Sequence, residues 1–286
     1  MVQKIDLHIH STFSDGQLSP QELVERGCDL RVTALAVTDH NTLGHLPDVF
    51  EAGARLGMEI ISGVEISVTI EGWNCHLLSY GFDPKNFLLR ERLNYFREFY
   101  HRRLQEVAII FYQFGIAFSI DRAKRIAIRP ARKNHIAMAA FEMEENRKRF
   151  ESEGIIDHVG FKSRYLDKGM PAHIPKARMS AEEAIILTHQ AGGKIFLAHP
   201  QATLNGSFYR DIIPLVGSLH DLGLDGIEVF HPDNDRNATM ILRGLVDEFG
   251  LLESAGSDFH GSYPPRLRLG EWQNFDLTPR LDWLTT

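Results

Sequence analysis

The alternation of short apolar segments with capped helices constrains the fold more than any other feature of this 286-residue chain. Buried strands are predicted at Thr33–Thr38 and Lys194–Ala198, because each is a short apolar run bounded by polar or turn residues. Helices with recognisable caps precede these two runs: Ser19 with Pro20 begins one before Thr33–Thr38, and Ser180 begins another before Lys194–Ala198. Strands that alternate with helices across short connections predict an α/β fold, with a mostly parallel sheet or barrel.

The first predicted strand, within Lys4–Asp15, carries the earliest sign of a function. Apolar residues alternate with polar ones along it, so that His8 and His10 share one face. Two imidazoles on one face of a buried strand are costly to hide unless something binds their nitrogens, and a divalent metal is a common partner. Asp15, in the turn just beyond, adds a carboxylate. Taken alone, the pair is also compatible with two histidines held by ordinary hydrogen bonds.

Side chains of the kind that bind metals stand at or just past the ends of nearly all the predicted strands. They are His8, His10, Asp15, His40, Glu65, His76, His199, His231, Asp258 and His260. In parallel α/β barrels the C-terminal ends of the strands meet on one face, so these residues are expected to meet in space. Nitrogen and carboxylate ligands without cysteine favour Mn²⁺, Fe²⁺ or Zn²⁺ in a catalytic site over a structural zinc site. The set is larger than one ion can bind, which indicates more than one.

A helical segment interrupts the alternation and is predicted to form a subdomain. From about residue 87 to 168 the spacing is helical, with an apolar stripe that runs from Leu89 to Val107. The expected domains are a barrel of residues 1–86 and 176–286 and an inserted helical cap of residues 87–175. The arginines of the first inserted helix fit a solvated face better than a phosphate site. The basic cluster at Arg129–His135, near a predicted helix start, suits anion binding and a solvated surface equally well.

The composition indicates the cellular compartment and the kinds of partner that suit the protein. The net charge of −7 argues against a protein that coats nucleic acid through bulk electrostatics. No apolar run approaches membrane-spanning length, and the N-terminus enters a strand without a signal-peptide pattern. Two cysteines, Cys28 and Cys75, provide no disulfide framework, which fits a reducing compartment. A cytoplasmic location without membrane contact is therefore expected.

Taken in order, the strand-end motifs resemble those of the PHP family, the polymerase and histidinol phosphatase superfamily. The matching motifs are D-L-H-I-H-S at 6–11 with S-D-G at 14–16, T-D-H-N-T at 38–42, G-V-E at 63–65, C-H at 75–76, L-A-H-P at 197–200, G-I-E-V at 226–229 and G-S-D-F-H at 256–260. They extend from the first predicted strand to the last, so the resemblance covers the chain. It implies a distorted barrel of seven βα units with a trinuclear metal centre, and the activity of a metal-dependent phosphoesterase.

The resemblance also implies how the ligands divide among the ions. The first ion would be held by His8, His10, Glu65 and Asp258. The second would be held by Asp15, His40 and His260, and the third by Glu65, His76 and His199, with Glu65 bridging. Two to three divalent ions are expected, with Mn²⁺ foremost and Fe²⁺ or Zn²⁺ as alternatives. All nine positions carry residues able to bind a metal, which favours an active enzyme over a decayed relative.

Within the family, the insertion resembles that of small stand-alone phosphoesterases, which act on nucleoside 3′,5′-bisphosphates and on short RNA 5′ ends. The resemblance lies in Phe161, in Tyr165-Leu166 and in the segment P-A-H-I at 171–174. The sequence departs from the family pattern twice on the substrate side. Lys133-Asn134-His135 stands where an R-x-H signature is usual, and His173 replaces a tyrosine. The expected partner is a small phosphorylated substrate of the nucleotide class.

The expected reaction is the attack of a metal-bridging hydroxide on a phosphate monoester. Cations about 3.5–4 Å apart lower the pKa of a bridging water and neutralise the phosphoryl oxygens. The side chains predicted to bind substrate are Arg132, Lys133 and His135 from the insertion, Arg266 from the loop after His260, and His231. A catalytic role in protonating the leaving alkoxide and a structural role are alternatives for His231. Asp6 and Asp39, beside ligand histidines, are expected to accept hydrogen bonds that fix imidazole tautomers.

Other functions are compatible with the same residues. Histidinol phosphate or a cyclic phosphodiester would suit the same metal centre. An amidohydrolase would use a similar barrel, but many such enzymes need a carboxylated lysine, and no lysine falls at a predicted strand end where it could bridge two ions. A non-catalytic, regulatory PHP module is the alternative from another class, and the complete ligand set argues against it.

Overall fold

The computed structural model divides into two compact units. It describes residues 4–127, 133–173, 175, 177–261, 268–272 and 275–285. One unit comprises Met1–Leu93 and Arg178–Thr286, and the other comprises Asn94–Ala177. The helix α3 (Phe87–Gln113) begins in the first unit and continues into the second. Its first turns are fixed to the first unit, where the Arg92 guanidinium donates two hydrogen bonds, of 2.6 and 3.0 Å, to the Glu183 carboxylate.

Three parallel strands form the first sheet. They are β1 (Ile5–Ile9), β2 (Ala34–Val37) and β3 (Glu59–Ile60), in the order β1-β2-β3. Two helices connect them, α1 (Pro20–Asp29) and α2 (Leu46–Leu56). Ser19 caps α1 in a capping box with Glu22, and Gly57 ends α2 in the left-handed conformation, with a φ of 70°. Both helices therefore begin and end close to where their local signals predict.

The second sheet has the strand order β6-β4-β5-β7-β8-β9. Its strands are β4 (Gly63–Ile70), β5 (Trp73–Tyr80), β6 (Met179–Ser180), β7 (Lys194–Leu197), β8 (Gly226–Phe230) and β9 (Leu252–Ala255). β4 and β5 pair antiparallel across Glu71 and Gly72, whose positive φ values of 46° and 90° suit a tight hairpin turn. β7, β8 and β9 are parallel to one another.

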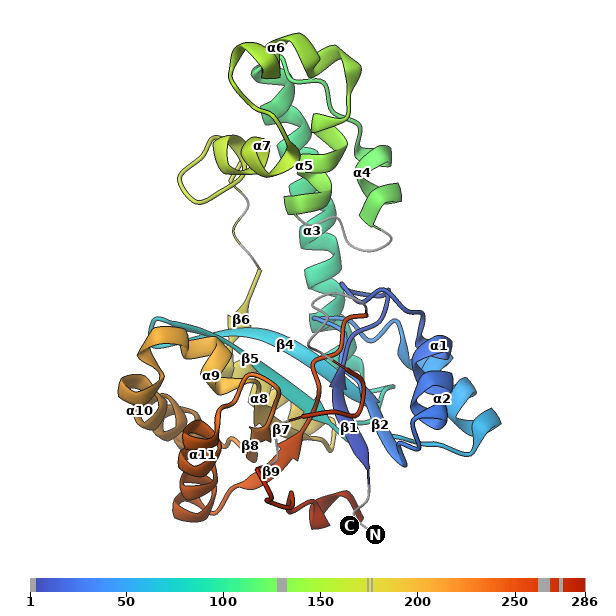
Figure 1. Ribbon diagram of the computed structural model, residues 1–286, viewed down its shortest axis with the longest axis vertical. Coiled ribbons are helices and arrows are strands. Elements are labelled where there is room, and N and C mark those ends of the chain that lie inside the picture. Colours follow the sequence, from blue (N-terminus) through green and yellow to red (C-terminus); the bar gives the residue numbers. More distant parts are fainter. Residues whose placement is uncertain are drawn as a thin grey trace. The chain divides into compact units, whose positions relative to one another are not determined.

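Backbone hydrogen bonds join the two sheets on both sides and close a barrel (Figure 1). Next to β1, the Asp258 N–H donates to the His8 carbonyl at 2.8 Å. Between the end of β2 and the start of β4, the Glu65 N–H donates to the Thr38 carbonyl at 3.2 Å. The barrel differs from seven βα units between β3 and β5, where β4 follows β3 and the antiparallel strand β5 follows β4 without an intervening helix.

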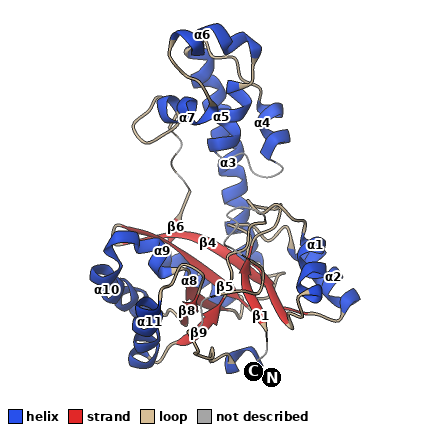
Figure 2. Ribbon diagram, viewed as in Figure 1, coloured by secondary structure: helices blue, strands red, loops and turns tan. Residues whose placement is uncertain are grey.

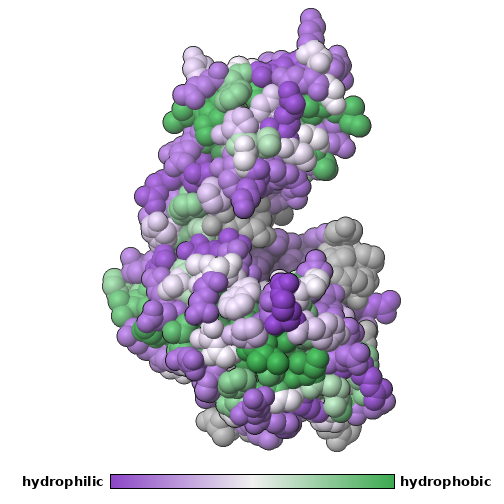
Figure 3. Space-filling model, turned by 90° about the vertical axis from the view of Figure 1, so that its left-hand side faces the viewer, coloured by the Kyte–Doolittle hydropathy of each residue, from purple (hydrophilic) through white to green (hydrophobic). Residues whose placement is uncertain are grey.

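Helices lie around the outside of the barrel, as Figure 2 shows. Besides α1 and α2 they are α8 (Ala181–Gln190), α9 (Pro200–Leu204), α10 (Phe208–Asp221) and α11 (Arg236–Phe249). Short 3₁₀ helices lie at Glu144–Asn146, Asn205–Ser207 and Asp282–Thr285. Buried Leu23, Val24 and Val49 pack α1 and α2 against the first sheet. Apolar side chains also gather on the outer face over α10 and α11, where Ile213 and Met240 are exposed (Figure 3).

The second unit is helical and has a core of its own. It holds most of α3 together with α4 (Ile120–Ala127), α5 (Lys133–Phe141), α6 (Arg147–Ser152) and α7 (His158–Tyr165). The ring of Phe161 lies 5.4 Å from that of Phe111 and 5.1 Å from that of Phe150, and all three are buried. The side chain of buried Asn146 binds the backbone of Ala117 and Ala140. In the part of the chain that the structure describes, no helix combines the length and apolar character that crossing a membrane requires.

Candidate metal centre

The structure brings the nine predicted metal ligands together where the parallel strands end. They are His8 in β1, His10 and Asp15 after it, His40 after β2, Glu65 in β4, His76 in β5, His199 after β7, and Asp258 and His260 after β9. His76 reaches this end from inside its strand, because β5 runs antiparallel and its register places His76 opposite Ser67. Its neighbour Cys75 is buried opposite Val68, and burial raises the pKa of that thiol to about 12.

The carboxylate of Glu65 lies in the middle of the cluster. Its Oε1 is 2.7 Å from His76 Nδ1 and 2.9 Å from His199 Nε2. Its Oε2 is 2.8 Å from His40 Nδ1 and 3.2 Å from His10 Nε2. Glu65 is completely buried, so its negative charge is compensated by these neighbours and not by bulk water.

Two further carboxylates lie among the histidines at the rim of the cluster. Asp258 Oδ1 is 3.2 Å from His10 Nε2 and 3.4 Å from His8 Nε2. Asp15 Oδ1 is 3.5 Å from His260 Nε2 and 3.7 Å from His10 Nδ1. Each carboxylate is therefore shared by histidines from different segments, as in a centre that holds more than one cation.

Buried atoms without hydrogen-bond partners test whether these residues suit metal ions. His8 Nε2, His10 Nε2, His40 Nδ1 and Glu65 Oε2 are all buried and none of them makes a hydrogen bond. Each of the three nitrogens nevertheless lies 2.8 to 3.6 Å from Glu65 Oε2. Buried polar atoms are normally hydrogen-bonded. Close approach without hydrogen-bond geometry means that these nitrogen and oxygen atoms face a shared space, which fits divalent cations.

The charges of the centre depend on one another. Burial alone would raise the pKa of Glu65, but His40, His76 and their neighbours outweigh it and hold that pKa well below its usual range. Burial would likewise lower the pKa of His10, yet Asp258 and Glu65 raise it to about 10. For His40, burial dominates and lowers the pKa to about 4. The Glu65 carboxylate therefore stays ionised, and its charge is balanced by protons on imidazoles or by metal ions that replace those protons.

Unusual backbone conformations accompany the ligands. His199 and Asp258 have positive φ values of 29° and 52°, in a region that residues with a side chain rarely adopt. Gly256 lets the loop after β9 lie against β1, because a Cβ at this position would come within 2.2 Å of the His8 Cβ. Such conformations persist only where the surroundings hold them, and they cluster at functional sites.

Comparison with known proteins decides the family. The family model of the PHP domain matches residues 6–184. The chain belongs to the PHP domain family. One relative, a 5′-3′ exoribonuclease from Haemophilus influenzae, is 33% identical over 91% of this chain and 91% of its own length. A 3′,5′-nucleoside bisphosphate phosphatase from Chromobacterium violaceum is 31% identical over 90% of this chain and 87% of its own length.

A solved structure shares the fold of this PHP protein. It is described as an amidohydrolase from Chromobacterium violaceum with bound sulfate and no metal. It is 30% identical, covers 99% of this chain and 95% of its own, and has a TM-score of 0.76. The matches confirm the family and the α/β fold that the sequence predicted. They also confirm the class of enzyme, a metal-dependent phosphoesterase and thus a hydrolase.

Asp6 binds the loops that follow β9, beside the candidate metal centre. Among the described contacts, its carboxylate does not meet the ring of a proposed ligand histidine. Its carboxylate accepts hydrogen bonds from the Ser257 N–H and hydroxyl, at 2.9 and 2.6 Å, and from the Gly270 N–H at 2.7 Å. Burial raises the pKa of Asp6 to about 6 in spite of these bonds. The prediction that Asp6 fixes an imidazole tautomer is therefore wrong, because backbone and hydroxyl donors of the loops after β9 surround it.

Asp39 reaches a ligand histidine only through an intermediate residue. Its carboxylate accepts hydrogen bonds from the Ser11 N–H at 2.8 Å and from the Ser14 hydroxyl at 2.5 Å. The same Ser14 hydroxyl lies 3.3 Å from His10 Nδ1. The expected direct contact with a ligand imidazole is thus corrected to an indirect one, in which Asp39 orients the serine and the serine faces the ring.

The sequence alone did not single out Glu228, which the structure places against the centre. This residue is fully buried in β8, with Oε1 2.9 Å from His8 Nδ1 and Oε2 accepting the His199 N–H at 2.7 Å. A signal was present in the G-I-E-V motif, since a carboxylate inside an apolar buried strand needs partners. It was missed because the candidate ligands were sought at the ends of strands and Glu228 lies inside one.

His231 presents a hydrogen-bond donor to the centre. Its Nδ1 accepts the Asp233 N–H at 3.0 Å, so the neutral ring carries its proton on Nε2. That Nε2 is buried, makes no hydrogen bond and lies 3.7 Å from Asp258 Oδ2. This geometry suits each of the predicted roles of His231, which are to bind a phosphoryl oxygen, to protonate a leaving group, or to play a structural part beside Asp258.

The other predicted substrate contacts are not tested by the structure. Lys133 and His135 lie in α5 of the helical unit, where Lys133 Nζ is 3.5 Å from His173 Nδ1. Arg132 and Arg266 lie outside the described residues. Phosphate binding by these four side chains stays a prediction.

Proposed function

We propose that this enzyme hydrolyses a phosphate monoester of a small nucleotide, of the 3′,5′-bisphosphate type, and acts on short RNA 5′ ends as related substrates. One observation carries the proposal: eight other ligand-type side chains gather with the buried Glu65, and several of the atoms that face it make no hydrogen bond. The names of the exoribonuclease and of the bisphosphate phosphatase support this substrate class.

The proposed ligands form three groups. The first is His8, His10, Glu65 and Asp258, the second Asp15, His40 and His260, and the third Glu65, His76 and His199. Potential ligand atoms of His10, Asp15, His40 and His260 all lie within 4.8 Å of one another, which supports the second group. The third is supported by Glu65 Oε1, which lies within 2.9 Å of both its histidines. A donor set of nitrogen and carboxylate oxygen favours Mn²⁺, with Fe²⁺ or Zn²⁺ as alternatives.

The chain's own residues supply charge, orientation and a proton. When bound, divalent ions supply Lewis acidity toward a phosphoryl group. The negative charges of Glu65 and Asp258 would attract the cations and keep them together in the centre. Hydrolysis forms a P–O bond to the oxygen of a water molecule and breaks the P–O bond to the nucleoside, whose departing oxygen takes up a proton. The Nε2–H of His231 is the donor placed to provide that proton or to bind a phosphoryl oxygen.

A substrate panel tests the proposal. Metal-free protein is reconstituted with Mn²⁺, and product release is measured with adenosine 3′,5′-bisphosphate, AMP, histidinol phosphate, a cyclic phosphodiester, an RNA pentamer and an N-acyl amino acid. We expect turnover of the bisphosphate or the RNA, and its loss in H199A. The amide is included because a similar solved structure is described as an amidohydrolase. Turnover of the amide alone, or of no compound in metal-loaded protein, would overturn the nucleotide proposal.

A further inference from the structure

Glu228 connects two segments that carry proposed ligands. It is completely buried in β8, and each of its carboxylate oxygens meets a different donor. Oε1 lies 2.9 Å from Nδ1 of His8, on β1, and Oε2 accepts the backbone N–H of His199, after β7, at 2.7 Å. Both partners offer protons, so an ionised carboxylate, which only accepts, satisfies them together.

The first of these contacts decides which nitrogen of His8 is left for a metal. A carboxylate at Nδ1 holds the ring proton there, and the lone pair is then on Nε2. Nε2 is the atom that lies 3.6 Å from Glu65 Oε2 and 3.4 Å from Asp258 Oδ1, and it makes no hydrogen bond. Glu228 thus turns His8 toward the proposed first group of ligands.

The second contact holds a backbone conformation that is otherwise unfavourable. His199 has a φ of 29° and a ψ of 60°, and it directly precedes Pro200, a position at which helical conformations are disfavoured. The short hydrogen bond from its N–H to Glu228 opposes relaxation of this segment. It also fixes the point from which the His199 ring reaches Glu65, 2.9 Å away, in the proposed third group.

Close packing leaves no room for another group to take the place of this carboxylate. A Cβ on Gly256 would lie 2.8 Å from Glu228 Oε1 and 2.2 Å from the His8 Cβ. The loop after β9 therefore covers the contact between Glu228 and His8. Water is excluded on that side, and a hydrogen bond lost there would not be replaced.

We propose that Glu228 is a positioning residue of the metal centre, which sets the tautomer of His8 and the conformation of His199 and so couples two groups of metal ligands. This inference rests on the ligand groups of the proposed function. It predicts that this one buried carboxylate controls the affinity of both groups for Mn²⁺.

The substitution E228Q separates the charge of Glu228 from its shape. Glutamine has one accepting oxygen and one donating NH₂, so it satisfies only one of the two donors. If the NH₂ faces His8 Nδ1, the ring proton moves to Nε2 and the metal-binding lone pair is lost. If it faces His199, the N–H of that residue loses its acceptor. E228D keeps an accepting carboxylate, and we expect it to recover part of the lost affinity.

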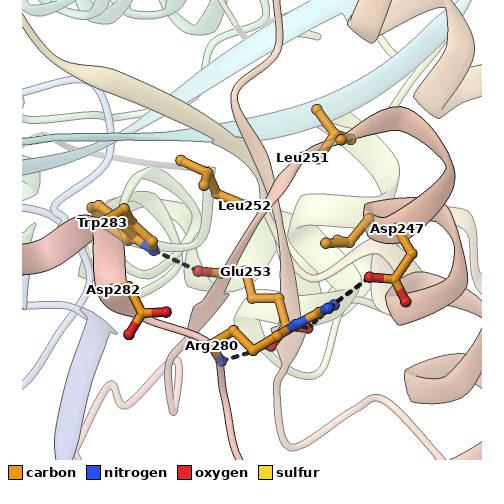
Figure 4. Close-up of a pocket in the computed structure, with 9 residues that line it drawn as sticks. Asp247, Leu251, Leu252, Glu253, Arg280, Asp282 and Trp283 are labelled. Atoms are coloured by element: carbon orange, nitrogen blue, oxygen red, sulfur yellow. Dashed lines mark hydrogen bonds and ion pairs between the residues drawn. The ribbon is translucent and has the colours of Figure 1, made fainter.

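E253Q provides a matched control. Glu253 is equally buried, in the neighbouring strand β9, but at the end of that strand remote from Asp258. Its carboxylate pairs with Arg243 and with Arg280, beside a cavity of about 300 Å³ that Figure 4 shows. Neutralising Glu253 therefore reports the general cost of removing a buried charge without touching the ligands.

Metal binding is measured directly and without substrate. Full-length metal-free proteins are titrated with Mn²⁺ by calorimetry, bound metal is counted by mass spectrometry, and unfolding temperatures of the metal-free forms are compared. We expect E228Q to bind Mn²⁺ about 10- to 100-fold more weakly than wild type, as for other outer partners of metal ligands. E253Q should bind as wild type does. Histidine ¹H–¹⁵N spectra of the Zn²⁺ forms should show the His8 Nδ1–H in wild type and its loss in E228Q.

The outcomes distinguish this inference from the proposed function. Wild-type affinity in E228Q, or an equal loss in E253Q, would overturn the role of Glu228 alone. Absence of Mn²⁺ binding by wild type would overturn the metal centre and this inference with it. A failure of the nucleotide panel alone would overturn the substrate proposal and leave the role of Glu228 supported by binding. If E228Q does not fold, weakened Mn²⁺ binding by folded E228D supports the inference, and wild-type binding by it overturns the inference.

Discussion

At the residue scale, Glu65 shows why a buried carboxylate makes a useful centre for cations. Its two oxygens face imidazoles from four different segments at 2.7 to 3.2 Å, and burial keeps those contacts free of competing water. Attraction between opposite charges is much stronger in such surroundings than at the protein surface. The same burial makes the carboxylate costly to leave unpaired, so the site depends on its counter-charges.

The substitution E65Q should remove both activity and metal. A neutral amide cannot balance cations in a buried site, and Lewis acidity toward a phosphoryl group is worth several kcal/mol. We expect kcat/KM to fall by about 1,000-fold or more, since each 1.4 kcal/mol is a factor of ten in rate. Bound Mn²⁺ per chain, counted alongside, should fall too. E59Q, at an exposed position of β3, is the control and should retain both. Full Mn²⁺ content in E65Q would contradict the central place of this residue.

Two glycine-to-alanine substitutions should have opposite effects. G256A places a methyl group within 2.2 Å of the His8 Cβ, so either the loop or the strand must move and the centre is distorted. We expect G256A to lower the stability and to weaken Mn²⁺ binding. G217A fills open space inside α10, where alanine is favoured over glycine by about 1 kcal/mol. Urea unfolding monitored by circular dichroism measures both, and a stable G256A with wild-type Mn²⁺ affinity would contradict the packing argument.

The candidate ligands at strand ends could be predicted from the sequence, whereas the residues that hold those ligands in position could not. His40 and His199 can be recognised in the sequence because each follows the end of an apolar strand. The barrel then brings the ends of these strands together on one face. The partners of Glu228 lie 220 and 29 positions away, in β1 and after β7. Only the closed barrel brings them into contact, so local patterns contain no information on which donor the carboxylate meets.

At the element scale, helices with local caps are the part of the fold that the sequence determines best. The Glu22 carboxylate accepts the Ser19 N–H at 2.7 Å, and the Ser19 hydroxyl accepts the Glu22 N–H at 3.3 Å. All donors and acceptors of this motif lie within four residues. The predicted start of α1 therefore needed no knowledge of the rest of the molecule.

The capping box gives a pH-dependent prediction. Hydrogen bonds from the backbone and side chain of Ser19 lower the pKa of Glu22 from its usual 4.5. A carboxyl group with a lowered pKa in the folded state stabilises the fold above its unfolded-state pKa, and this contribution disappears as the pH falls through the folded-state value. We expect E22Q to lose about 0.5–1 kcal/mol at pH 7 in urea unfolding. The difference from wild type should shrink below about pH 4.5.

A second glutamate of the same helix is the control for E22Q. Glu25 is exposed and pairs with Arg55 at 2.8 Å, and exposed ion pairs contribute about 0–1 kcal/mol. E25Q should therefore have a small effect that salt reduces. A loss in E22Q that persists unchanged at low pH would show that the carboxylate does not act through its charge.

Elements that depend on distant partners were harder to predict. The short helix α9 was not expected, because it begins directly after His199, whose positive φ is held by Glu228 and not by a local signal. The position of His76 was expected at a strand end, but it lies inside β5 and reaches the centre because that strand runs antiparallel. The turn at Glu71 and Gly72 is a local signal in the sequence, but the place of His76 in the site follows only from the pairing register.

At the scale of the whole molecule, the metal centre and the helical insertion belong to different compact units. All nine proposed ligands lie in the unit formed by Met1–Leu93 and Arg178–Thr286. The other unit, Asn94–Ala177, packs around its own aromatic core and contains the predicted phosphate contacts Lys133 and His135. A mutation that disrupts the core of the helical unit is thus expected to weaken substrate binding and to leave metal binding unchanged.

The substitution F161A should separate the two properties. Phe161 is fully buried between Phe111 and Phe150, and removing a buried phenyl ring costs about 3–5 kcal/mol. We expect limited proteolysis of F161A to cut within Asn94–Ala177, while Mn²⁺ content stays at the wild-type level because no proposed ligand lies there. Turnover of adenosine 3′,5′-bisphosphate should fall, since the predicted phosphate contacts are lost with the fold of that unit.

The control for F161A is a substitution of an exposed apolar residue in the same unit. Ile156 is 87% exposed, so I156A should change stability by less than about 0.5 kcal/mol and leave proteolysis, metal content and turnover unaltered. Loss of Mn²⁺ together with cleavage in F161A would show that the two units unfold as one. Unchanged turnover in an F161A protein that is cleaved within the insertion would remove Lys133 and His135 from substrate binding and leave the barrel unit to recognise the phosphate by itself.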